Sequence, residues 1–183
     1  MALLRRKAMA SAIARSQDGS ATAQKGRALE DFICALFEAV PGIEIIERNV
    51  LNAFATEELD VALWNGQSRA GLHFLPTLLL IECKNWSNPI GSQEISYFAA
   101  RLHQRNCDHG LLIAANGITG VDADLTAAHF QLATALASGV RILVFRLAEL
   151  QDLRTTQELC VAIKRKLCQL VARGTLAAAN PAV

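Results

Sequence analysis

The stretch Thr77–Trp86 reads Thr-Leu-Leu-Leu-Ile-Glu-Cys-Lys-Asn-Trp, and the rest of the sequence is best interpreted outward from it. A run this apolar is typical of a strand that is buried on both faces in the middle of a sheet. Because strand side chains alternate, we expect Glu82 and Lys84 on one face and Cys83 on the other. An acid and a base at the end of a core strand cost free energy unless they are paired or bind a metal ion. The stretch therefore predicts a central strand and marks its end as the first place to look for chemistry.

The bulk composition is that of a folded domain. The chain has 183 residues, of which 52% are hydrophobic and 19% charged, so it is long enough to bury one sizeable core. Its five cysteines are an odd number without a Cys-x-x-Cys pair, which favours reduced thiols over a disulfide framework or a zinc site. No apolar run reaches the roughly 18–20 residues that a membrane span needs. We therefore expect a cytoplasmic protein without a membrane partner.

The formal net charge of +1 conceals an uneven distribution. Residues 1–27 carry six Lys or Arg and one acid, and residues 141–183 carry seven and three, whereas residues 28–140 carry five basic and thirteen acidic side chains. Basic ends around an acidic centre would suit a polyanion bound at the rim and a cation held in the middle. Solvated helix faces and a basic tail explain the same pattern equally well. The charge pattern alone leaves both interpretations open.

The hydrophobic pattern predicts one α/β domain. We expect residues 1–20 to be a basic flexible segment, residues 21–174 to be a single domain, and residues 175–183 to be a flexible tail. Within the domain the periodicity predicts the order α-β-β-β-α-β-α-β-α. The predicted helices cover about 22–40, 92–106, 121–139 and 155–174, and the predicted strands cover 43–50, 57–64, 77–85, 110–115 and 140–147. Ser92 is expected to cap the second helix, and Thr155 with Glu158 to form a capping box at the last.

Two carboxylates are expected to meet on neighbouring strands. The strands at 57–64 and 77–85 follow each other, so an antiparallel pair is the default. If their connection is symmetric about Gly71, Asp60 lies opposite Glu82, with Cβ atoms roughly 5 Å apart. Two carboxylates at that distance repel each other unless a proton or a divalent cation lies between them, and oxygen ligands favour Mg²⁺ or Mn²⁺.

Lys84 is expected on the same face as Glu82, where it could orient or deprotonate a metal-bound water. Together these residue types predict metal-assisted phosphodiester hydrolysis. The alternative is an exposed ion pair between Glu82 and Lys84 at a strand end, which would contribute about 0–1 kcal/mol to stability.

These residues resemble a known family. Glu30 on the first helix, Glu58-Leu59-Asp60 and Glu82-Cys83-Lys84, in the order α-β-β-β-α-β, resemble the PD-(D/E)XK nuclease superfamily. Lys25-Gly26-Arg27-Ala28-Leu29-Glu30, Glu82-Cys83-Lys84-Asn85-Trp86 and Gly91-Ser92-Gln93-Glu94-Ile95 resemble its Mrr-like restriction endonuclease branch. The similarity covers roughly residues 22–147, and Leu59 replaces the proline that names the motif. The resemblance implies a restriction-endonuclease-like core, with a central mixed sheet flanked by helices and an extra C-terminal helix.

The resemblance also implies a role for each site residue. Asp60, Glu82 and the backbone carbonyl of Cys83 would hold Mg²⁺, with Mn²⁺ as a substitute, and Lys84 would support the attacking water. Glu30 would help with this metal or a second one. Gln93 matches a polar residue found near the site in some members and would orient the water or the phosphate.

The expected function is that of a metal-dependent endonuclease that hydrolyses DNA and serves as the nuclease subunit of a restriction or phage-defence system. The chain carries no recognisable helix-turn-helix or zinc finger, so we expect targeting of double-stranded DNA through a homodimer or a partner subunit. Two alternatives stay open at this point. One is a structure-selective nuclease that resolves DNA junctions, and the other is a catalytically inactive subunit that keeps the fold for binding.

Overall fold

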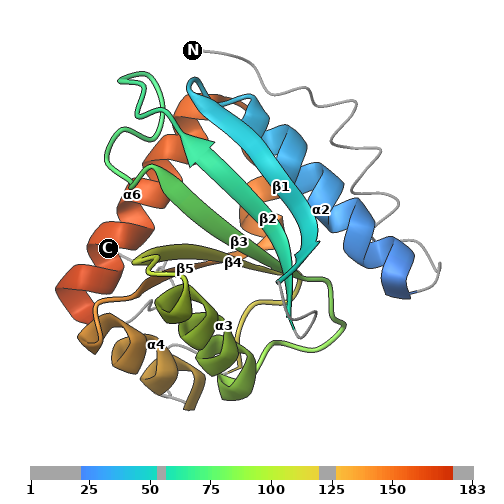
Figure 1. Ribbon diagram of the computed structural model, residues 1–183, viewed down its shortest axis with the longest axis vertical. Helices are drawn as coiled ribbons and strands as arrows, with labels where there is room; N and C mark the ends of the chain where they lie inside the picture. The colour runs from blue at the N-terminus through green and yellow to red at the C-terminus, as the bar shows by residue number, and fades with distance from the viewer. Residues whose placement is uncertain (1–21, 53–56, 120–126, 175–183) are drawn as a thin grey trace.

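The computed structural model describes residues 22–52, 57–119 and 127–174 (Figure 1). Its elements, in chain order, are α2 (Thr22–Glu38), β1 (Ile43–Leu51), β2 (Glu58–Asn65), β3 (Leu78–Lys84), α3 (Ser92–Gln104), β4 (His109–Ala114), α4 (Ala127–Ala137), β5 (Arg141–Arg146), α5 (Leu147–Gln151) and α6 (Thr156–Arg173). The segments 1–20 and 175–183, for which we predict flexibility, and the first part of the predicted third helix, lie outside the described residues.

The five strands form one sheet in the order β1-β2-β3-β4-β5. The first three strands are antiparallel, and β4 and β5 continue the sheet in parallel from β3. The predicted mixed sheet is confirmed, and β3, which lies within Thr77–Trp86, is its central strand. In β3, Leu79, Leu80 and Ile81 are buried, as expected for a strand covered on both faces.

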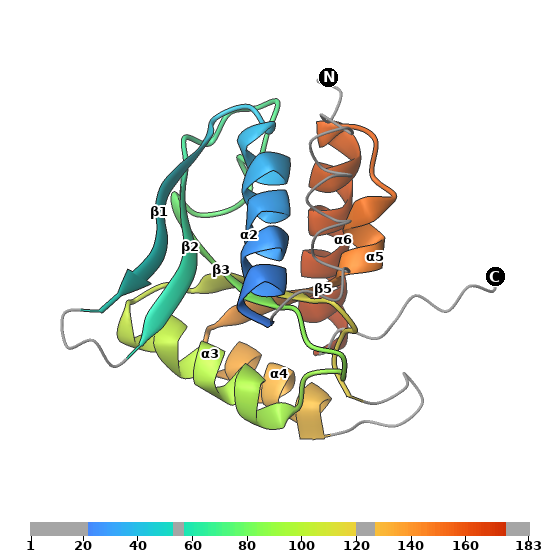
Figure 2. The same cartoon turned by 90° about the vertical axis from the view of Figure 1, so that its right-hand side faces the viewer.

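Helices cover both faces of the sheet. Figure 2 shows α2, α5 and α6 on one side, and α3 and α4 on the other. The apolar stripe of α2 is buried against the strands, with Leu29, Ile33 and Leu36 fully enclosed. On the other side α3 packs closely on β4, because Gly110 has no side chain and leaves room for Phe98 and Leu102 of α3. This close approach sets the distance between α3 and the sheet.

The register between β2 and β3 agrees with the prediction. Val61 pairs with Ile81 and Leu63 with Leu79, as a connection symmetric about Gly71 requires. The same register carried one residue further would set Asp60 opposite Glu82. The start of β2 and the end of β3 therefore lie side by side.

A buried asparagine holds the connection between these strands. The side-chain amide of Asn65, which has no exposed surface, donates hydrogen bonds to the carbonyl oxygens of Leu72, Leu75 and Pro76 at 2.8, 3.1 and 3.1 Å. Gly71 lies in the same connection, where an added Cβ would collide with the carbonyl oxygen of Pro41. The connection is therefore a packed structure that fixes the strand register.

Three local predictions need correction. Ser92 is the first helical residue of α3, whereas Gly91 is the N-cap, and Glu94 accepts a hydrogen bond from its backbone N–H at 3.0 Å. Thr155 does cap α6, but the carboxylate of Glu158 accepts from the N–H of Arg154 instead of completing a capping box. The short helix α5 was not predicted, because a helix of five residues is too short to show a period.

Two expectations about composition can be compared with the structure. All five cysteines are free thiols, with Cys168 exposed and Cys34, Cys107 and Cys160 buried. Within the part of the chain that the structure describes, none of the helices has the length and apolar character to cross a membrane.

Candidate active site

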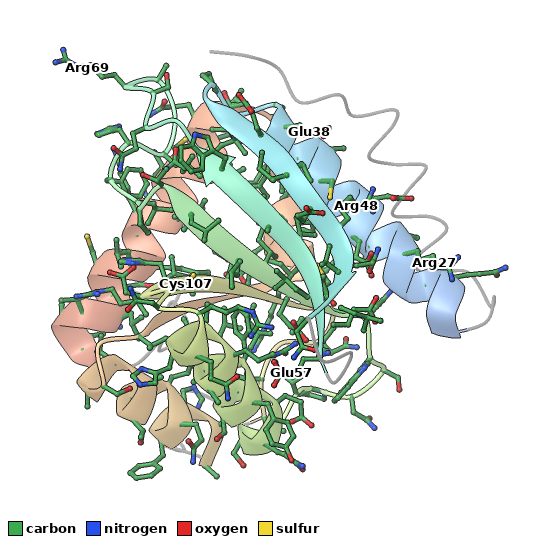
Figure 3. The ribbon with its side chains drawn as sticks, viewed as in Figure 1. Arg27, Glu38, Arg48, Glu57, Arg69 and Cys107 are labelled. Carbon is green, nitrogen blue, oxygen red and sulfur yellow. The ribbon has the colours of Figure 1, made fainter. Side chains whose placement is uncertain are left out.

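The candidate site lies where β2 begins and β3 ends. Antiparallel pairing brings these two ends together, so Asp60 near the start of β2 lies beside the last residues of β3. Its Oδ2 accepts a hydrogen bond of 2.6 Å from the backbone N–H of Cys83. Figure 3 shows Glu57 at this end, next to α3, and Arg69 at the opposite end of the sheet in the β2–β3 connection.

Glu82 is the most buried charged group of the site, with 1% of its surface exposed. Its Oε1 lies 2.7 Å from Nζ of Lys84 and 2.7 Å from Nη2 of Arg101. Its Oε2 is also buried, and it has no hydrogen-bond partner within the described part of the chain. A buried carboxylate oxygen without a partner costs free energy, so this atom is a ready acceptor for a cation or a proton donor.

The pKa of Asp60 is raised because Asp60 is buried beside other carboxylates. Burial and the nearby charge of Glu82 raise the pKa of Asp60 from its ordinary 3.8 to about 7, and Glu30 adds to the rise. The N–H of Cys83 and the charge of Lys84 oppose this shift of the pKa without cancelling it. Proximity of like charges in a buried place is the physical cause. A positive ion at this position would stabilise the ionised pair.

The Cys83 side chain contributes no charge to the site. Burial raises the pKa of its thiol well above the ordinary value, and the neighbouring carboxylates add to the effect. The thiol therefore stays protonated near neutral pH, which makes it a poor metal ligand. Only the backbone of Cys83 remains as a candidate for binding a hard cation, as the sequence analysis expects.

Arg101 of α3 joins the site, and the sequence analysis missed it. Besides its ion pair with Glu82, its Nη1 donates a hydrogen bond of 3.0 Å to the carbonyl oxygen of Glu58, and its guanidinium lies 5.7 Å from the centre of the Phe98 ring. The sequence offers only a weak signal for it. Arg101 stands between Phe98 and Leu102, both buried, so its side chain starts from the edge of the helix face that packs on the sheet.

Glu30 is buried on α2 but is engaged by β1 instead of β2 or β3. The side-chain amide of Asn49 donates to its Oε2 at 2.9 Å, and Nη2 of Arg48 lies 3.9 Å from the same oxygen. Figure 3 shows Arg48 beside α2. Asn49 has a left-handed backbone with φ of 51°, a conformation that asparagine tolerates and that is unusual inside a strand. Sequence reasoning did not find Asn49, because nothing in the local pattern marks it.

Gln93 lies in the first turn of α3 and is exposed. Its Nε2 donates a hydrogen bond of 2.8 Å to the hydroxyl of Tyr97, one turn later. The structure thus brings Asp60, Glu82, Cys83 and Lys84 together. It places Glu30 and Gln93 on the neighbouring helices, with partners of their own.

The residues present can be tested against a divalent cation. The described residues contain no group of three or more His, Cys, Asp or Glu side chains arranged to hold a metal ion. Two observations nevertheless fit a cation: the Oε2 atom of Glu82, which has no partner among the described residues, and the raised pKa of Asp60. Two carboxylates with one backbone carbonyl are hard oxygen donors of the kind that Mg²⁺ and Mn²⁺ accept, with water completing the shell. The site fits such an ion through these donors.

A family model described as a restriction endonuclease, Mrr_cat, matches residues 22–153, which is more than two thirds of the chain. The chain belongs to this family. The predicted resemblance to Mrr-like nucleases is thereby confirmed, and the mixed sheet with its flanking helices fits the restriction-endonuclease-like fold. Membership of this family, whose model is described as a restriction endonuclease, supports a nuclease activity for the domain.

Other comparisons add little to the Mrr_cat match. No curated protein matches the chain. One similar solved structure is that of Pyrococcus furiosus SfsA in complex with Ca²⁺, with 19% sequence identity and a TM-score of 0.37. The similarity covers 69% of the present chain and 59% of SfsA. A similarity this low carries no information about the activity of the Mrr_cat domain.

Proposed function

We propose that this domain is a Mg²⁺-dependent endonuclease that cuts double-stranded DNA, with Mn²⁺ as a substitute, and that it serves as the nuclease subunit of a restriction or phage-defence system. The observation that carries the proposal is the buried Oε2 of Glu82, which has no partner among the described residues and belongs to the carboxylate that raises the pKa of Asp60. A site that keeps such an unfavourable arrangement gains stability or activity only when a cation or substrate completes it.

Asp60, Glu82 and the backbone carbonyl of Cys83 would hold the cation, with Glu30 as an auxiliary acid. When bound, the ion would polarise the scissile phosphate and lower the pKa of a water molecule. Glu30 would act from its place on α2, where Asn49 fixes its carboxylate at 2.9 Å.

Lys84 would act on the attacking water and the phosphate. Its Nζ lies 2.7 Å from Oε1 of Glu82 and 5.7 Å from the centre of the Trp86 ring, so the ammonium is held at the end of β3. From there it can donate hydrogen bonds to a water and to a phosphate oxygen. In hydrolysis the water oxygen bonds to phosphorus while one ester P–O bond breaks. The water loses a proton to the carboxylates or solvent, and the leaving alkoxide takes one up. Gln93 would orient the water or the phosphate.

Targeting would come from self-association or from a partner subunit. A duplex has two strands, so two active sites in a homodimer would be a simple route to double-strand cuts. The five free thiols suit a reducing compartment, and we include a cytoplasmic location in the proposal.

A cleavage assay tests the proposal. Supercoiled, linear, single-stranded and branched DNA, and RNA, would be incubated with Mg²⁺, Mn²⁺ or EDTA. Lys84→Ala should lower the cleavage rate by about 100-fold or more and remain folded by circular dichroism. Lys164→Ala is the matched control, because Lys164 lies on α6 over the Phe74 ring at 4.8 Å, outside the site. Cutting at the wild-type rate by Lys84→Ala would remove Lys84 from the mechanism.

The substrate pattern distinguishes the alternatives. A preference for branched over linear DNA would indicate a junction-resolving nuclease. No cutting of any substrate, together with no Mg²⁺ or Mn²⁺ binding by calorimetry, would indicate a nuclease-fold subunit without activity and would overturn the proposal.

A further inference from the structure

Two cations share one oxygen of Glu82. Both Nζ of Lys84 and Nη2 of Arg101 lie 2.7 Å from Oε1. A single positive partner is enough to neutralise one carboxylate, so the pair is redundant as a counter-charge. The redundancy is informative because the proposed function asks Lys84 to contact water and phosphate as well.

The shape of the Arg101–Glu82 contact is also unusual. An ion pair built for stability between arginine and a carboxylate is commonly bidentate, with two N–H groups on two oxygens. Here Oε2 of Glu82 and Nε of Arg101 are both buried and have no partner among the described residues. The contact therefore uses one oxygen of Glu82 and leaves the other without a partner among the described residues.

We propose that Arg101 is the positioning residue of this site: it holds Glu82 through Oε1, which releases Lys84 for the reaction and keeps Oε2 for the cation. This inference rests on the proposed nuclease function. Arg101 acts through Glu82 and is not itself a catalytic residue.

Arg101 is better fixed than Lys84 for this task. Its Nη1 is bound to the carbonyl oxygen of Glu58 at 3.0 Å, and its side chain is 15% exposed, against 25% for Lys84. The guanidinium is planar and its donors keep a rigid geometry, whereas a lysine ammonium rotates on a flexible stem. The second contact of Lys84 is with Trp86, which is 42% exposed. Lys84 can therefore leave Glu82 while Arg101 stays.

The kinetic test compares Arg101→Met with a control on the same helix. Arg105→Met removes the same charge one turn later, where Arg105 pairs with Glu57 at 3.2 Å and does not contact Glu82. In Arg101→Met, Lys84 is the one cation left on Glu82 among the described residues, so kcat for DNA cleavage should fall by about 10–100-fold with KM within about threefold. Arg105→Met should keep kcat within about twofold. Arg101→Lys, which retains the charge, should recover part of the lost kcat.

A second readout needs neither metal nor DNA. If either cation alone can hold Glu82, Lys84→Ala should lower the melting temperature in EDTA by only about 3 °C, whereas Lys84→Ala with Arg101→Met should lower it by about 10 °C or more. That loss should exceed the sum of the two single shifts, because the double variant leaves a buried carboxylate without a counter-charge. Should Arg101→Met fail to fold, Arg101→Gln, which keeps a donor and loses the charge, replaces it in both tests.

The outcomes separate the two proposals. Wild-type kcat in Arg101→Met would overturn the positioning role of Arg101, and melting shifts that simply add would overturn the inference that either cation alone can hold Glu82. A wild-type protein that cuts no nucleic acid would instead overturn the nuclease proposal, and the melting cycle in EDTA would still decide whether Arg101 and Lys84 share the support of Glu82.

Discussion

Replacing Asp60 with asparagine removes one of the two carboxylates that meet where β2 begins and β3 ends. The substitution keeps the shape of the side chain, and its amide oxygen can still accept the 2.6 Å hydrogen bond from the N–H of Cys83. The main change is therefore the loss of a charge that burial and Glu82 disfavour. We expect Asp60→Asn to stabilise the metal-free protein while abolishing cleavage.

The magnitude follows from the pKa of Asp60, which rises from 3.8 in its ordinary state to about 7 in the folded protein. An acid with a higher pKa in the folded state binds its proton more tightly there, so the folded state loses stability as the pH rises from about 4 through 7. At 1.36 kcal/mol per pKa unit, the loss is on the order of 4 kcal/mol at pH 8 and less than half of that at pH 5. The asparagine in the Asp60→Asn variant does not titrate, so the variant does not lose this stability as the pH rises.

Urea denaturation in EDTA at pH 5 and pH 8 measures the effect. At pH 8 the variant should be more stable than the wild type by about 2–4 kcal/mol, and its melting temperature should be higher by roughly 5–10 °C. The control is Asp31→Asn, which removes an exposed carboxylate that pairs with Arg48 at 2.8 Å. A surface pair of this kind contributes at most about 1 kcal/mol, so this control should gain no stability at high pH.

Two results would refute the reasoning about Asp60. One is an equal loss of stability between pH 5 and pH 8 in the wild type and in the Asp60→Asn variant. The other is a variant that is less stable than the wild type at pH 8 in EDTA. Addition of Mg²⁺ should raise the melting temperature of the wild type and leave that of the variant almost unchanged, because ligand binding stabilises only the protein that binds it.

Two further predictions concern the framework of the site. Asn65→Leu leaves the three loop carbonyl groups bound by Asn65 without their donor, so the free energy of unfolding should fall by about 2–4 kcal/mol in urea titrations; a loss below the error of that titration would show that the loop does not depend on Asn65. Gly110→Val places a side chain against Phe98 and Leu102, where even a Cβ would lie 2.8 and 2.6 Å from them. The free energy of unfolding should fall by about 1–3 kcal/mol, and the cleavage rate should fall because α3 moves away from the sheet. Full stability and activity in Gly110→Val would contradict the close packing of α3 on β4.

Much of the fold could be predicted because its signals are local. The apolar run before Glu82 indicates a central strand, and its direct succession to the preceding strand along the chain favours an antiparallel pair. Symmetry about Gly71 then gives the register, which the pairing of Val61 with Ile81 confirms. The burial of the α2 stripe follows from its helical period in the same way.

The parts that could not be predicted depend on contacts between distant elements or on very short segments. Asn49 on β1 donates a hydrogen bond to Glu30 on α2, and no local sequence pattern encodes that contact. The five-residue α5 is too short to show a period. The N-cap of α3 falls on Gly91 because Glu94 accepts the hydrogen bond of its backbone N–H, which displaces the expected role of Ser92.

The residues alone predict that an acid and a lysine end a core strand, and that a second acid on the neighbouring strand lies opposite them. These features follow from the period-two alternation of strands and from a connection taken as symmetric about Gly71. The folded arrangement was needed to show that Arg101 and Lys84 share Oε1 of Glu82, while Oε2 has no partner among the described residues. That contact depends on how closely α3 approaches the sheet. The distance is set by the packing of α3 against Gly110 on β4, and it can be read only once both elements are in place.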